Sequence, residues 1–259
     1  MLSTKSSYFM KSYSFVPILH DKAQPFAISK LSLAMLASLL VSGISPTYAL
    51  DGNENGGHVD IPKGTVIQSQ DVYGYFDTSE TAEDVKGGLI TIAGEVVDGR
   101  IIGGFSLYGQ VIDNAVIVNG GTVNSAALYG GRGQGTQGNQ VKLAGVTVNA
   151  DIYGGAVRGS IGGLNNSVQI TEGSTVEGSL YGARSQESDL TSNTVTINDS
   201  QVTIRRSEAI YGAYTNLGDV TGNSIDISDS SIEKTGDSAD FIYLMGGSTA
   251  MGDANQNTV

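Results

Sequence analysis

Cysteine and tryptophan are absent from this chain of 259 residues, and histidine occurs only twice. Without cysteine, the chain can form no disulfide framework and carry out no thiol chemistry. The one histidine after residue 49, His58, leaves too few nitrogen or sulfur ligands for a zinc site, and a Ser-His-Asp triad would have to use it. Because no G-x-S-x-G elbow accompanies His58, we expect neither a metal site nor a serine hydrolase.

Positive charge is scarce as well. The sequence has 26 acidic and 14 basic residues, and its formal net charge is −12. The first 49 residues hold four of the lysines and one of the acids, so residues 50–259 keep 25 acids and 10 bases, a net charge near −15. Such a chain repels nucleic acid phosphates and anionic lipid headgroups, and we expect neither as a partner.

The sequence has a single long apolar run, near its N-terminus. Residues 31–44 are uncharged, follow a segment with scattered lysines, and precede Thr47-Tyr48-Ala49. A basic region, a short apolar core and small residues before the cut are typical of a signal peptide, so we expect export by the Sec machinery and cleavage after Ala49. The alternative is a membrane anchor, but the run is shorter than the roughly 20 residues that cross a bilayer. Residues 1–49 are therefore predicted to be a signal peptide.

Glycine, in contrast, is abundant, with 36 copies, of which 35 follow residue 49. Each interior glycine costs a helix about 0.5–1 kcal/mol relative to alanine, so we expect no long helices there. Many of the glycines belong to a repeat whose landmark is an aliphatic residue, tyrosine, glycine and a small residue. Successive copies lie 24–32 residues apart, and Ile102 takes the place of tyrosine in one of them. The tyrosines of the other copies are Tyr73, Tyr129, Tyr153, Tyr181, Tyr211 and Tyr243.

A second landmark lies midway between the tyrosines. It is an asparagine with an aliphatic residue at +2 and usually another at +4, and Gly88 replaces the asparagine in an early copy. A third short segment, rich in valine, isoleucine and threonine, follows each of these. Each unit therefore carries about three short strands with period-two alternation, separated by turn-forming residues. The asparagines are Asn114, Asn139, Asn166, Asn193 and Asn223.

Strands this short at such regular spacing predict that successive units stack. In a parallel β-solenoid each coil pairs with its neighbours at about 4.7–4.9 Å, and equivalent side chains form columns. We predict an all-β, parallel β-helix of about seven coils over residues 72–259, with residues 50–71 as a polar lead-in and N-terminal cap. The inward columns would be Val116, Val141, Val168, Val195 and Ile225, and next to them Leu143, Ile170, Ile197 and Ile227.

Two ladders are expected at the corners of the coils. The asparagines share the parity of the inward aliphatic residues, so their amides can hydrogen-bond along the stack and satisfy polar groups that would otherwise cost about 1–3 kcal/mol each. The tyrosines would form an aromatic column. We interpret this column as structural, and the alternative is an exposed strip that binds glycans. The rings face outward if the aliphatic residue before each tyrosine takes the interior.

The sequence resembles the passenger domains of autotransporters, the type V secretion proteins. The likeness lies in the leader, the lack of cysteine, and the N-x-V-x-I and [VIL]-Y-G-[GA] segments, and it covers residues 72–259. It implies a right-handed parallel β-helix that a C-terminal outer-membrane barrel displays at the cell surface. Since the sequence stops inside a further repeat, at Asn257-Thr258-Val259, and lacks a barrel pattern, we expect an N-terminal fragment, truncated at its C-terminus, of a protein that includes the barrel.

Three functions remain open. The leading one is a secreted or surface-exposed passenger segment without catalysis or cofactors, which acts as an adhesin for host or matrix glycans or proteins, or as a spacer. The alternative is a secreted β-helix polysaccharide lyase or glycoside hydrolase, which would need a groove of clustered acids and bases, although Arg205-Arg206 is the one adjacent basic pair. A third is a trimeric adhesin head with shorter left-handed coils. The G-x-G-x-x-G match at 133–138 precedes a β-pattern, so we expect no nucleotide there.

Overall fold

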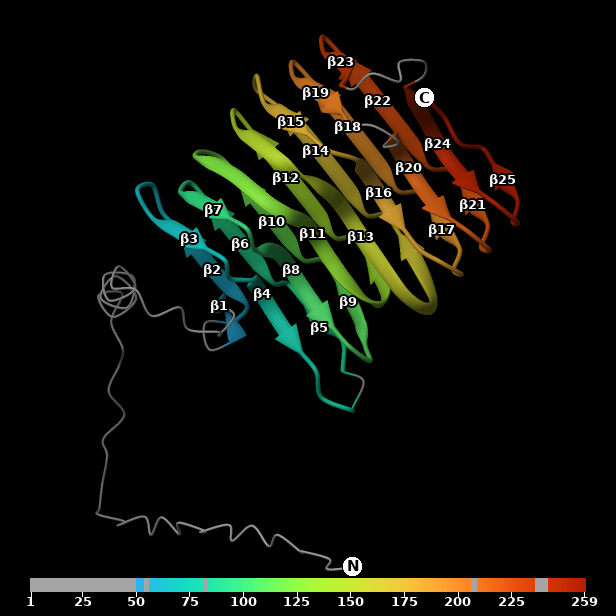
Figure 1. Cartoon of the computed structure of the whole chain (residues 1–259). Helices are drawn as coiled ribbons and strands as arrows, with labels where there is room; N and C mark the ends of the chain where they lie inside the picture. The colour runs from blue at the N-terminus through green and yellow to red at the C-terminus, as the bar shows by residue number, and fades with distance from the viewer. Residues whose placement is uncertain (1–49, 54–55, 82, 206–208, 236–241) are drawn as a thin grey trace, which may run out of the picture. The chain divides into compact units, whose positions relative to one another are not determined.

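The computed structural model describes residues 50–259 except 54–55, 82, 206–208 and 236–241 (Figure 1). The predicted signal peptide, residues 1–49, lies outside these described residues. Within them, regular secondary structure consists of strands without a helix. Strands from successive coils pair in parallel, as β10, Ala115–Val118, does with the strands on either side of it. The all-β, parallel β-solenoid predicted from the repeat is therefore confirmed.

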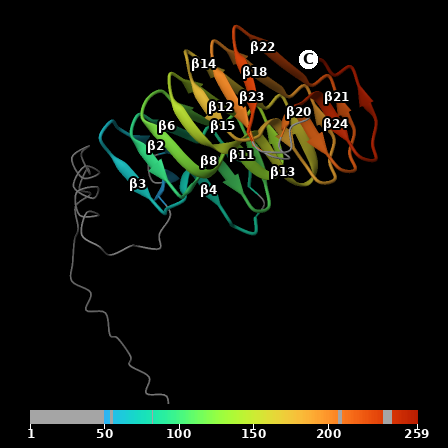
Figure 2. The same cartoon turned by 45° about the horizontal axis from the view of Figure 1, so that its top comes forward.

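One side of the solenoid is a seven-stranded sheet to which each coil contributes one strand (Figure 2). These strands begin one residue after the landmark asparagine or glycine, and their side chains alternate between the core and solvent. The strands are β2 (His58–Ile61), β6 (Leu89–Ile92), β10 (Ala115–Val118), β12 (Gln140–Ala144), β14 (Ser167–Thr171), β18 (Thr194–Asn198) and β22 (Ser224–Ser228).

The remaining 18 strands form a second, bent sheet with three rows. Two long strands, β11 (Thr122–Gln137) and β13 (Thr147–Leu164), run through all three rows and join them into one sheet. The first row, which follows the seven-stranded sheet along the chain, holds β3 (Val66–Gln68), β7 (Glu95–Val97), β15 (Thr175–Glu177), β19 (Gln201–Ile204) and β23 (Ser231–Lys234).

The second and third rows complete each coil. The second row carries the tyrosine landmark, and the third leads back to the seven-stranded sheet. The second row holds β1 (Leu50–Asp51), β4 (Val72–Asp77), β8 (Arg100–Ser106), β16 (Leu180–Arg184), β20 (Ala209–Thr215) and β24 (Tyr243–Thr249). The third row holds β5 (Val85–Lys86), β9 (Gln110–Ile112), β17 (Leu190–Thr191), β21 (Val220–Thr221) and β25 (Ala254–Asn255).

The core lies between the sheets and is built from columns of equivalent side chains. Val116 pairs with Val141, Val141 with Val168, and the column continues through Val195 to Ile225, as predicted. The valines are fully buried and Ile225 is nearly so. The second predicted column, Leu143, Ile170, Ile197 and Ile227, is also in register. Burying each such side chain contributes about 1.5–3 kcal/mol, so the columns hold neighbouring coils together.

The solenoid begins earlier than the tyrosine repeat indicates. The strand β2 pairs in register with β6, so that Val59 lies beside Ile90 and Ile61 beside Ile92, and all four side chains are buried. The strand β3 likewise pairs with β7. Residues 50–71, interpreted from the sequence as a lead-in and cap, thus contain strands in coil register, because the alternation of His58–Ile61 supplies two inward aliphatic residues. None of the described residues form a helix with the length and hydropathy to span a membrane.

Candidate functional site

The five predicted asparagines lie in one buried column. The side-chain Nδ2 of each donates to Oδ1 of the next, at 2.9–3.0 Å, from Asn114 through Asn223 and on to Asn257. Each accepting Oδ1 also receives the backbone N–H of the preceding asparagine, at 2.8–3.2 Å. At the other end, the backbone N–H of Gly88 donates to Asn114 Oδ1 at 2.7 Å. The column satisfies polar groups inside the solenoid and offers nothing to a ligand.

A left-handed turn residue stands directly before every position of this column. These residues have φ between 54° and 71°, a region that glycine, asparagine and aspartate adopt most readily. The turn sends the chain from the third row into the seven-stranded sheet and directs the next side chain inward. The turn residues are Gly87, Asp113, Gly138, Asn165, Ser192, Gly222 and Gln256.

Four of the six predicted tyrosines form a continuous stack on the outer face of the second row. The ring centroids of Tyr129 and Tyr153 are 4.8 Å apart, those of Tyr153 and Tyr181 4.9 Å, and those of Tyr181 and Tyr211 5.3 Å. The ring planes of each pair lie within 13° of parallel. The spacing follows the distance between paired strands. The rings face outward because the preceding aliphatic residue of each copy, such as Ile152, is fully buried in the core.

The other two predicted tyrosines stand outside this stack. Tyr73 pairs with Ile102, which separates it from Tyr129, and its ring packs instead on Phe76, with centroids 4.6 Å apart. Tyr243 is exposed and pairs with Ala209, so the prediction that it joins the column is wrong. The register of β24 places Met245, two residues later, beside Tyr211.

Three arginines from successive coils lie along the tyrosine stack. Arg132 of β11 has its guanidinium carbon 5.4 Å from the ring centroid of Tyr129, and Arg184 of β16 lies 5.4 Å from that of Tyr181. Arg158 of β13 reaches over Phe105, at 5.7 Å. Each cation–π contact of this kind contributes about 0.5–1 kcal/mol at an exposed site. We call the four stacked tyrosines and these three arginines the tyrosine–arginine strip.

The strip contains an open depression of about 140 Å³. Arg132, Arg158 and Arg184 line it together with Tyr129 and Tyr153. Arg184 Nη1 donates to the phenol oxygen of Tyr153 at 3.4 Å. Among the described residues, no carboxylate oxygen lies within 4.0 Å of any of these three guanidinium groups. The depression is therefore a cationic site on an acidic chain.

Burial sets the protonation state of the phenols. Loss of solvent raises the pKa of Tyr129, Tyr153 and Tyr211 above the ordinary value of 10.0. For Tyr153 the nearby Asp151 carboxylate raises the pKa further, because it repels a phenolate. These phenols therefore remain neutral at physiological pH, and their hydroxyl groups can donate hydrogen bonds.

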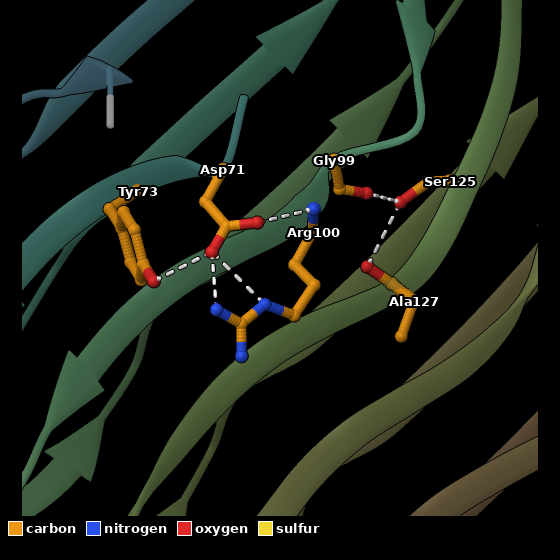
Figure 3. Close-up of polar contacts among 6 residues, drawn as sticks. All are labelled: Asp71, Tyr73, Gly99, Arg100, Ser125 and Ala127. Atoms are coloured by element: carbon orange, nitrogen blue, oxygen red, sulfur yellow. Dashed lines mark hydrogen bonds and ion pairs between the residues drawn. The ribbon is translucent and has the colours of Figure 1, made fainter. Parts of the chain in front are cut away.

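Arg100, at the start of β8, differs from the three arginines of the strip because it forms an ion pair with Asp71 (Figure 3). Its Nε donates to Asp71 Oδ2 at 3.0 Å, its Nη2 forms a second, shorter bond with the same oxygen, and its backbone N–H donates to Oδ1 at 2.9 Å. Tyr73 donates its hydroxyl to Oδ2 at 3.2 Å. Burial alone raises the pKa of Asp71, but the hydrogen bonds and charge of Arg100 outweigh it and hold that pKa below 3.8.

Sequence reasoning found the tyrosines of the strip but missed its arginines. A usable signal exists, since Phe76, Phe105, Arg132, Arg184 and Tyr214 each stand three residues after the landmark position of their coil. Registers such as Phe105 with Arg132 place these residues in one column. In the β13 coil Ala156 holds that position, and Arg158, two residues on, supplies the cation.

The remaining residues singled out in the sequence do not join the strip. His58 is an exposed residue of β2, in the seven-stranded sheet. Residues 133–137 of the G-x-G-x-x-G match lie within the strand β11 rather than before a helix. Arg205 pairs with Glu177 at 3.1 Å in the first row. Comparisons with protein-family models, with curated proteins and with solved structures found no match.

Proposed function

We propose that the chain is an exported, surface-displayed solenoid segment of the autotransporter passenger type, and that it acts as a non-catalytic adhesive rod. The leader pattern, the lack of cysteine and the acidic composition of residues 50–259 support export. The solenoid supports a rod, because coils that contact only their neighbours extend along one axis.

The observation that carries the adhesive role is the tyrosine–arginine strip. The asparagine column and the aliphatic columns already hold the coils in register from inside. The strip adds aromatic and cationic side chains on the outer face, where they enclose a depression. Tyrosine and arginine are enriched at the energetic centres of binding interfaces.

The test is to express the full chain in a Gram-negative host and to follow both its export and its attachment. Intact mass of the exported protein should correspond to a chain that begins at Leu50. Wells coated with extracellular-matrix glycans and proteins should retain cells or protein with the wild-type chain, and a strip variant should be retained less. Retention in the cytoplasm, or attachment that is indifferent to the strip, contradicts the proposal. Release of shortened or unsaturated sugars from a polysaccharide would favour the lyase or hydrolase alternative.

A further inference from the structure

The charge of the strip is opposite to that of the rest of the chain. Three of the 10 basic residues in 50–259 line one depression, although this part of the chain has a net charge near −15. Mutual repulsion of three neighbouring cations is unfavourable unless anions neutralise it. Asp71 neutralises Arg100 in this way, but none of the described residues that line the depression is acidic. Asp151, which acts on Tyr153, has its Oδ1 bound to the backbone N–H of Ser179 at 3.0 Å. The arginines are thus arranged for an anion from outside.

The orientation of the rings decides how a ligand can use the tyrosines. Within the stack, the faces of Tyr153 and Tyr181 are covered by the neighbouring rings, so a sugar ring cannot lie flat on them. What the stack presents is ring edges and neutral hydroxyl groups. Tyr153 accepts a hydrogen bond from Arg184, which leaves its own proton for a ligand oxygen. Such a surface suits a ligand rich in oxygen acceptors better than an apolar one.

The spacing of the arginines indicates the kind of polyanion. Arg132 and Arg184 are in register through Ala156, so they are two strand spacings, about 9.4–9.8 Å, apart. The guanidinium of Arg158 lies over Phe105, which is one strand spacing before Arg132. Intervals of one and two strand spacings are comparable to the lengths of one and two sugar units in an extended polysaccharide. An extended peptide brings side chains to one face only about every 6.6–6.8 Å. Duplex DNA carries a charge for about every 1.7 Å of its axis, far denser than the strip, and the acidic remainder of the chain repels it.

We propose that the tyrosine–arginine strip binds an acidic polysaccharide whose sugars carry carboxylates, with the polymer running along the solenoid axis. Arg132, Arg158 and Arg184 each hold a carboxylate of the same polymer, since the guanidinium fork matches a carboxylate in a bidentate pair. The phenols of Tyr129 and Tyr153 donate to sugar or carboxylate oxygens. This inference rests on the proposed function as a surface-binding segment and names the ligand class for it.

The experiment uses the full chain as the host exports it and compares two forms of one polymer. Polygalacturonate and its fully methyl-esterified form share a backbone, but the ester has no charge. Calorimetric titration should show binding of polygalacturonate and at least tenfold weaker binding of the ester. Raising the ionic strength from about 0.1 to 1 M shortens the Debye length from about 10 to 3 Å, so the same affinity should fall with salt.

Variants locate the effect on the strip. Arg158 is exposed and contacts Phe105 alone among the ring contacts of the described residues, so R158Q should leave the fold intact. We expect R158Q to weaken binding of polygalacturonate about tenfold, which corresponds to about 1.4 kcal/mol, and R132Q/R158Q to weaken it further. The matched control is K142Q, which removes one positive charge from an exposed position of β12 in the seven-stranded sheet and should not change the affinity.

Three results would overturn this inference. Equal binding of polygalacturonate and its methyl ester would show that the strip does not recognise carboxylates. An equal loss of affinity in R158Q and K142Q would show that net charge, and not the strip, matters. Arginine-dependent binding of polyglutamate or of anionic lipid vesicles, without binding of polygalacturonate, would assign the strip to another class of partner.

If the chain attaches to coated surfaces but not to polygalacturonate, the ligand class is wrong while the adhesive function stands. If the chain attaches neither to coated surfaces nor to polygalacturonate, both the ligand class and the adhesive function are wrong.

Discussion

Replacing Asn166 by alanine should destabilise the solenoid at one defined place. The side chain of Asn166 links the coils on either side of it. Its Oδ1 accepts the backbone N–H and the Nδ2 of Asn139, at 3.2 and 3.0 Å. Its Nδ2 donates to Asn193 Oδ1 at 2.9 Å and to Thr136 O at 3.2 Å. The alanine variant removes all of these bonds from a fully buried position.

The size of the destabilisation in N166A depends on which polar groups around residue 166 keep a hydrogen-bond partner. Asn139 Nδ2 still donates to Val111 O at 2.8 Å, and Asn193 Oδ1 still accepts the backbone N–H of residue 166 at 3.0 Å. The backbone N–H of Asn139 loses the acceptor described for it, which costs about 1–3 kcal/mol for a buried donor. The donor bonds lost from Asn166 contribute about 1 kcal/mol more in total. We therefore expect the free energy of unfolding to fall by about 3 kcal/mol.

Urea denaturation followed by circular dichroism measures the loss, and amide hydrogen exchange locates it. The control is Gln169→Ala on β14, the strand that follows Asn166, an exposed change that should stay within about 0.5 kcal/mol of wild type. Asn166→Asp should be worse than alanine at neutral pH, because it buries a negative charge whose second oxygen faces the acceptor oxygens of Asn193 and Thr136. Burial should raise the pKa of that carboxyl, so its penalty should shrink as the pH falls. A loss below about 0.5 kcal/mol in N166A, with the Asn139 amide still protected, would refute the ladder as a source of stability.

Three further changes test other parts of the structure. Tyr153→Ala removes two stacked ring pairs worth about 0.5–1.5 kcal/mol each, and it also removes the burial of a ring that is 6% exposed. It should lower stability by about 2–4 kcal/mol in urea denaturation, whereas Tyr153→Phe should stay close to wild type. Asp71→Asn should flatten the pH dependence of stability. Because the pKa of Asp71 is lowered in the folded state, its contribution to the free energy of unfolding is complete above about pH 3.8 and is lost as the pH falls through the pKa of the folded state. If wild type and D71N lost stability equally in acid, the pairing of Asp71 with Arg100 would be contradicted. Gly154→Ala should reduce the melting temperature sharply, because a Cβ there would lie 2.5 Å from the Gly182 carbonyl oxygen of the next coil. An unchanged melting temperature would show that the two coils can move apart to accommodate the methyl group.

The arginine site shows where sequence reasoning stops. Tyr129 and Tyr153 could be aligned from their motif, but Arg158 has no equivalent at its position in the other coils. Arg158 lies beside Arg132 and Arg184 because of the way β13 pairs with β11 and β16. The pairing of β13 with β11 has a register shift between Gly133 and Gly135. Tyr243 is the opposite case, since its motif resembles the others while the pairing of β24 offsets it by two residues.

The sequence by itself determined the coil. Its periodic valines, isoleucines and asparagines share one parity, and only stacking in register buries all of them and joins each amide to the next, as in the pairing of Val141 with Val168 and of Asn139 with Asn166. The tertiary structure decided what the outer face carries. Interior columns require equivalent residues in every coil, whereas outward side chains are free of that requirement. Arg158 joins the other two arginines through the register shift of β13, and Tyr243 misses the stack through the offset of β24. Neither the shift nor the offset leaves a periodic trace in the sequence.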